Sequence, residues 1–179
     1  MSRIVHLPGF RRYVLIIIAL LMVNPSVLNA RDQGPEYQGY YANKLKIRID
    51  MNKSQIHKNL KRYRKDKSIA SLDASYALLI QSVDEIDLYF RNATQRVEDM
   101  PDSANAVKIK AQVDKLEIIN IRDIQLPYFC DRLYEVGQFY AKTDKNKAKQ
   151  CFRDIVTKFT SYESIRCREK ARFALDHLK

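Results

Sequence analysis

"IASLDASYALLIQSVDEIDLYFRNATQRV", residues 69–97, is the stretch that decides the fold of this chain of 179 residues. Its apolar residues recur at alternating steps of three and four, which is the spacing of one face of an α-helix. They are Ile69, Leu72, Tyr76, Leu79, Val83, Ile86, Phe90, Ala93 and Val97. Ser71 is a suitable N-cap, and the loop that starts at Met100-Pro101 ends the pattern. The stretch predicts a long amphipathic helix that must pack against other helices.

Helical patterns continue to the end of the chain. Residues 104–125 predict a helix that folds back on the first as an antiparallel partner. Its expected apolar side is Ala106, Ile109, Val113, Leu116 and Ile119. Pro127 interrupts the pattern and can open a new helix at 128–141, because proline is tolerated in a first helical turn. Further helices are expected at 147–159 and 164–178, and no stretch has the pattern of a strand. The sequence therefore predicts an all-α domain of antiparallel helical hairpins over residues 68–179.

The first thirty residues have the layout of a secretory signal. Three arginines and no acid precede the unbroken apolar run 13–23, and small residues lead up to Ala30. We expect residues 1–30 to be a signal peptide and the protein to be exported, to the periplasm or the extracellular space. The alternative is an uncleaved membrane anchor, since Leu28 is bulky where a small residue is usual. The run has 11 residues, whereas spanning a bilayer takes about 20.

Positive charge is concentrated in the next segment. Of the formal net charge of +11, the leader holds three, and residues 42–67 hold ten Lys or Arg against two Asp. Because apolar residues are sparse there, we expect residues 31–67 to be a flexible basic arm. Its cations suit an anionic membrane surface, and export argues against nucleic acid as the target. A linker kept soluble by its charge is the alternative. The candidate binding residues are Lys44, Lys46, Arg48, Lys58, Lys61, Arg62, Arg64, Lys65 and Lys67.

The stretch Leu133–Phe159 predicts two short helices joined by the polar turn "KTDKN". Small residues at Gly137 and Ala148 let the helices approach, and aromatic residues fill the space beside them. This arrangement resembles a tetratricopeptide repeat. The full set that carries the resemblance is Leu133, Val136, Gly137, Tyr140, Ala148, Phe152, Ile155 and Phe159.

That resemblance covers residues 128–178. It implies a repeat hairpin at 128–160, a capping helix at 164–178 and a protein-binding role. The chain departs from the family because the turn is one residue short and Thr160 stands in place of the terminal proline. A small helical bundle in which the same residues form an ordinary core is the alternative.

Three cysteines allow one internal disulfide at most, and none has the spacing of a zinc or redox motif. A repeat register of 34 residues aligns Cys167 with Leu133, one turn from Cys130, so a disulfide between Cys130 and Cys167 is one interpretation. We favour the other, in which all three cysteines are buried thiols that pack as small apolar residues.

No constellation of residues points to catalysis. The three histidines have no metal-ligand spacing, and the three glycines after the leader exclude a glycine-rich phosphate loop. The acids at 84, 85 and 87 lie beside the apolar seam and are interpreted as a solvated face. We therefore expect no enzymatic activity, no cofactor and no metal.

The sequence favours a non-enzymatic exported helical scaffold or adaptor that binds a protein partner. The alternative function is a peripheral or anchored membrane protein that binds anionic lipid or polymer through the basic arm. Homodimerisation through the seam at 69–97 is a further hypothesis.

Overall fold

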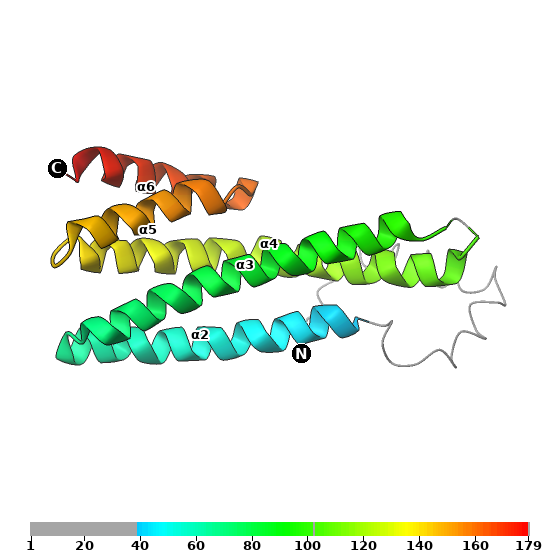
Figure 1. Cartoon of the computed structure of the whole chain (residues 1–179), viewed down its shortest axis with the longest axis horizontal. Coiled ribbons are helices and arrows are strands. Elements are labelled where there is room, and N and C mark those ends of the chain that lie inside the picture. The colour runs from blue at the N-terminus through cyan, green and yellow to red at the C-terminus, as the bar shows by residue number, and fades with distance from the viewer. Residues whose placement is uncertain (1–38, 102, 179) are drawn as a thin grey trace, which may run out of the picture.

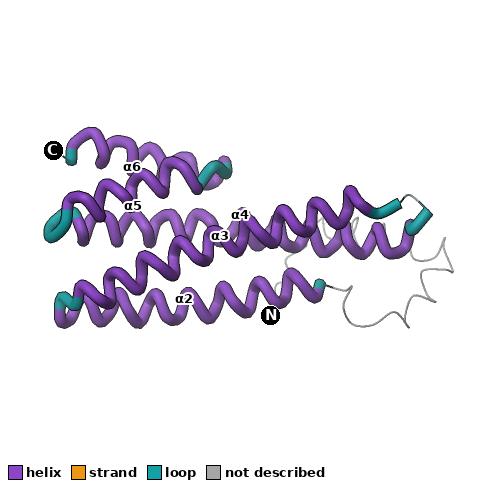
Figure 2. The backbone as a smooth tube through the Cα atoms, viewed as in Figure 1, coloured by secondary structure: helices purple, strands orange, loops and turns teal. Residues whose placement is uncertain are grey.

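The chain is all-α in the residues that the structure describes, which form five α-helices and one short 3₁₀-helix and no strand (Figures 1 and 2). The computed structural model describes residues 39–101 and 103–178, so the predicted leader lies outside the described residues. In this part of the chain no helix is long and apolar enough to cross a membrane. The elements are α2 (Tyr40–Asp66), α3 (Ile69–Asp99), α4 (Asn105–Tyr140), α5 (Lys145–Lys158), η4 (Tyr162–Ser164) and α6 (Ile165–His177).

Three long helices make the body of the molecule. Helix α3 packs along both α2 and α4, and α2 also contacts α4 directly. Helix α5 then packs on α4, and α6 packs on α5 and α4. Figure 1 shows that α5 and α6 lie over the C-terminal end of α4. They do not reach the N-terminal end of α4, which lies beside α3. The molecule is therefore a three-helix bundle with a shorter hairpin added at one end.

Helix α3 confirms the long helix predicted from the apolar seam. The seam residues Leu72, Leu79, Val83 and Ile86 are fully buried in one continuous core. The cap is Ser68 rather than Ser71, because the Ser68 side chain accepts a hydrogen bond from the backbone N–H of residue 71. Helices α2 and α4 pack against this seam, and homodimerisation through it stays a hypothesis.

The expectation of a flexible basic arm at 31–67 is wrong over residues 40–66, which form helix α2. Its apolar residues are sparse but fall on one face, and Leu45, Ile49, Ile56, Leu60 and Tyr63 are all buried in the core. Steps of four, seven, four and three keep them on one side of a helix. The charged side chains occupy the opposite side, where they stay in water, so a high charge density does not prevent order here.

Helix α4 runs unbroken through Pro127, so the predicted start of a new helix there is wrong. An interior proline loses one hydrogen bond and crowds the preceding turn, which costs about 3 kcal/mol. Buried Leu126 and Phe129, on either side of the proline, fix both halves of the helix to the same core. Their burial offsets that cost.

The predicted apolar side of the 104–125 helix is also wrong. Ile109, Val113 and Leu116 are exposed, whereas Ala111 and Ile118 face the core with Asp114. Asp114 can be buried because both of its carboxylate oxygens have partners. One accepts a hydrogen bond from the backbone N–H of Ala42, at 3.2 Å, and the other forms an ion pair with Arg96, at 3.4 Å. Helix α4 therefore has small and polar residues, such as Ala111 and Asp114, where it packs closely against α2 and α3.

Candidate functional site

The outward side of α2 carries the basic residues that the sequence marked for an anionic surface. Eight residues at alternating steps of four and three follow this side from one end of the helix to the other. They are Tyr40, Lys44, Ile47, Met51, Ser54, Lys58, Lys61 and Lys65, all exposed, and we call them the outer stripe of α2. At 1.5 Å per residue the stripe is about 38 Å long.

Some of the predicted basic residues have partners inside the protein. Arg48 pairs with Glu85 at 2.9 Å, Arg64 pairs with Glu135, and Lys67 lies over the ring of Tyr63. The two arginines attach α2 to its neighbours, while Lys67 contacts α2 itself, so the charge of these three side chains is not available in full to a ligand.

The Arg64 pair belongs to a small network. Burial raises the pKa of Glu135, but hydrogen bonds from Arg64 and Arg132 outweigh it and hold that pKa below its ordinary value. The carboxylate is therefore ionised at neutral pH and fixes the C-terminal half of α2 against α4.

Five of the predicted basic residues make no contact with an acid or aromatic ring in the described part of the chain: Lys46, Lys58, Lys61, Arg62 and Lys65. Four of these lie within two turns of one another at the C-terminal half of α2. Like charges held this close on a helix repel one another. An anionic ligand would relieve that repulsion, which makes this cluster the strongest candidate binding site. We call Lys58, Lys61, Arg62 and Lys65 the cationic cluster.

The eight residues that resemble a tetratricopeptide repeat lie together in the core between α4 and α5. All eight are buried, from Leu133 on α4 to Phe159 after α5. At Gly137 an added Cβ would lie 2.6 Å from the nearest ring atom of Phe152. The two helices therefore approach closely at this glycine. These residues are a packing site and line no surface, and the repeat itself stays a prediction.

A cavity of about 260 Å³ lies beside this core, lined by residues of α3, α4 and α5. Asp73 accepts hydrogen bonds from Lys147, at 2.6 Å, and from the Tyr140 hydroxyl. These two donors hold the pKa of Asp73 below its ordinary value. Burial raises the pKa of the Cys151 thiol, which also lines the cavity, to about 12. A thiol that stays protonated is a poor nucleophile, so the cavity has the features of a structural network.

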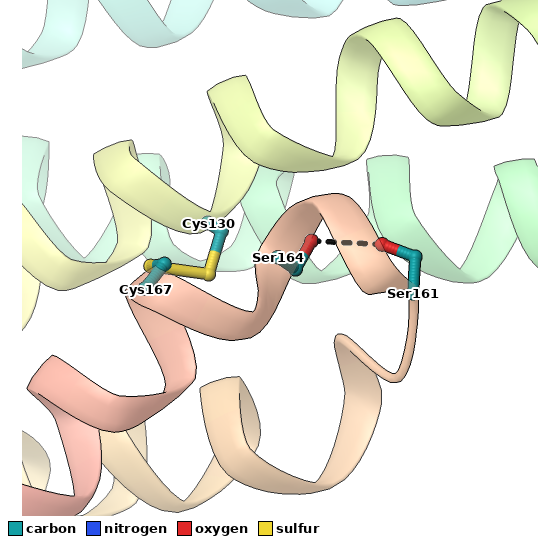
Figure 3. Close-up of a disulfide and its surroundings, with 4 residues drawn as sticks. All are labelled: Cys130, Ser161, Ser164 and Cys167. Carbon is teal, nitrogen blue, oxygen red and sulfur yellow. Dashed lines mark hydrogen bonds between the residues drawn. A yellow bond between two sulfur atoms is a disulfide. The ribbon is translucent and has the colours of Figure 1, made fainter.

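Cys130 and Cys167 form a disulfide between α4 and α6, with their Cα atoms 6.3 Å apart (Figure 3). The favoured interpretation as thiols is wrong for this pair and holds for Cys151, which is free and buried. Figure 3 also shows the hydroxyls of Ser161 and Ser164 bonded to each other, at 3.0 Å, in the turn that leads into α6. The disulfide fixes the last helix to the body.

Sequence reasoning missed one surface, a row of exposed apolar residues on α4 that extends from Ile109 to Ile124. The four residues lie on one side of the helix: Ile109, Val113, Leu116 and Ile124. Leu116 is 64% exposed. We call these four residues the α4 stripe. The signal was present in the sequence, because apolar residues of α4 fall on more sides of the helix than α2 and α3 can cover.

In the described residues no group of three or more His, Cys, Asp or Glu could hold a metal ion. No known protein family matches the chain, and no curated protein or solved structure is significantly similar to it. The surfaces of this molecule are therefore what indicates its function.

Proposed function

We propose that the protein is a non-enzymatic, exported helical protein that attaches to an anionic surface through α2. The observation that carries this proposal is the cationic cluster, four basic side chains on one helical face with no acidic partner in the described residues. Each basic side chain contributes about 1 kcal/mol near an acidic surface. Four together contribute about 4 kcal/mol, enough to raise the affinity about a thousandfold.

Two features support export. The first thirty residues have the layout of a signal peptide. The disulfide between Cys130 and Cys167 is of a kind that persists in oxidising compartments and is rare in the cytosol. Both features favour a place of action in the periplasm or outside the cell.

The experiment compares two variants with equal loss of charge. The first carries Lys58→Gln, Lys61→Gln, Arg62→Gln and Lys65→Gln. The control carries Lys142→Gln, Arg166→Gln, Lys170→Gln and Arg172→Gln, which are exposed basic positions outside α2. A deletion of the basic segment is unsuitable, because it would remove core residues of α2.

Binding is measured as the salt concentration that elutes each protein from heparin, a generic polyanion, after circular dichroism has shown equal helix content. We expect the cluster variant to elute at much lower salt than wild type and the control to elute close to it. Equal shifts in the two variants would mean that only net charge matters, and the proposal would then fail.

The α4 stripe favours a second function, that of a scaffold for a protein partner. Exposed apolar patches mark interaction sites, and the spacing of the stripe suits one amphipathic helix laid along α4. A photo-crosslinking residue in place of Leu116 should capture one defined protein in the native cells, and the same residue in place of Lys170 should not. Equal capture at both positions would exclude a specific scaffold.

A further inference from the structure

The outer stripe of α2 changes character halfway along the helix. Its N-terminal half carries Tyr40, Ile47 and Met51, and its C-terminal half carries Lys58, Lys61 and Lys65 of the cationic cluster, with Arg62 beside them. Ile47 and Met51 are 62% and 67% exposed, so neither contributes to the core. Lys44, between Tyr40 and Ile47 in the stripe, can extend its charged end past an apolar surface, as long basic side chains do at interfaces.

The two halves of the stripe suit different kinds of contact with a ligand, one electrostatic and one apolar. A soluble polyanion contacts the cations but gains nothing from exposed Ile47 and Met51. An acidic bilayer contacts both, because its headgroups attract Lys and Arg while apolar side chains enter the boundary with the acyl chains. Tyr40 suits the same boundary, where tyrosine is enriched.

The direction of the chain agrees with this arrangement. The residues before Gly39 join α2 at its apolar end, where Ala42 and Gly39 lie against Asp114 and Glu117 of α4. Fifteen residues separate the apolar run 13–23 from Gly39, and they span at most about 50 Å when extended. If the leader is retained as the alternative membrane anchor, it would hold this same end of α2 near the membrane; after cleavage, the outer stripe would have to bind by itself.

We propose that α2 lies flat on an acidic lipid bilayer, with Ile47 and Met51 inserted and the cationic cluster in contact with the headgroups. This inference rests on the proposed function and names the anionic surface as lipid. The buried face of α2 stays packed in the core, so attachment requires no unfolding of the body.

The sequence contains no tryptophan, which makes a direct test available in the full chain. The variant Met51→Trp places one fluorophore in the apolar half of the stripe. The control Tyr162→Trp places one at η4, where the side chain is 82% exposed. Each protein is mixed with vesicles of phosphatidylcholine alone or with an equal share of phosphatidylglycerol, with and without brominated acyl chains as quenchers.

We expect the M51W protein to shift its emission to the blue and to be quenched by brominated lipid on acidic vesicles only, while Y162W does neither. Partitioning should fall about tenfold or more in the variant Ile47→Ser with Met51→Ser. It should fall about a thousandfold when the cationic cluster is neutralised.

Three results would overturn the inference, and they separate it from the proposed function. If the protein sediments with acidic vesicles while M51W stays in water, attachment is electrostatic only and the proposed function stands. If it binds heparin but no vesicle, the surface is a polymer. If it binds neither, both proposals fail.

Discussion

Substitution of Gly137 by alanine tests how closely α4 and α5 approach. The added Cβ would lie 2.6, 2.9 and 3.1 Å from three ring atoms of Phe152, whereas carbon atoms pack best at about 3.5–4.0 Å. Phe152 is buried against Tyr134 and cannot move into solvent. Overpacking of this kind costs about 1–3 kcal/mol, and alanine returns about 1 kcal/mol of helix propensity. We expect a net loss of up to about 2 kcal/mol in the free energy of unfolding.

The assay is urea unfolding followed by far-UV circular dichroism, in wild type and in a Phe152→Leu background. Leucine lacks the two ring atoms that lie nearest to the added Cβ, so Gly137→Ala should stabilise that background by up to about 1 kcal/mol. The difference between the two backgrounds gives a coupling of about 1–3 kcal/mol. If Gly137→Ala has the same effect in both backgrounds, or stabilises wild type, the close approach does not exist.

Three further predictions concern the cysteines and the cavity. Cys130 and Cys167 are 37 residues apart, so reduction of their disulfide should lower the free energy of unfolding by about 4 kcal/mol. The measurement is urea titration with and without reductant. An unchanged free energy of unfolding would mean that α6 is held without the disulfide. The pKa of Asp73 is depressed in the native state, so its stabilisation is present at neutral pH and is lost as the pH falls below about 4. Unfolding of wild type and Asp73→Asn should therefore differ at neutral pH and converge in acid, and a constant difference would contradict this. The Cys151 thiol, with its pKa raised to about 12, should not react with a disulfide reagent near pH 8 until the protein unfolds, and rapid labelling of the native protein would refute its burial.

Helical periodicity predicts where the helices of this fold lie better than it predicts which of their residues are buried against other helices. The seam of α3 was readable because its apolar residues lie on a single face and both neighbours pack against that face. The prediction of a flexible arm is wrong over helix α2 because it rests on the small number of apolar residues, whereas Leu45, Ile49 and Ile56 keep the spacing of a buried face. Amphipathic spacing was the better guide, since a helix needs only one apolar side to join a core.

Helix α4 shows where a single sequence stops being sufficient. Pro127 was interpreted from its local effect, but the cost of an interior proline is small beside the burial of the helix on both sides of it. The choice between Ala111 and Val113 as the core side depends on how closely α2 and α3 approach, and the partner of Asp114 lies 72 residues away in the chain. Neither distance is encoded in local periodicity.

The two exposed surfaces constrain the function more together than either does alone. The outer stripe of α2 is opposite the face that packs in the core, while the α4 stripe lies on a different helix, so one ligand on α2 need not cover both. Attachment to a surface gives no reason for Leu116 and Val113 to be exposed on α4, because apolar residues there favour aggregation unless a partner covers them. A protein that only attached to a membrane could replace them with polar residues at no cost to its core. Their presence therefore favours a protein that is held at a membrane by α2 and leaves α4 free for a helical partner.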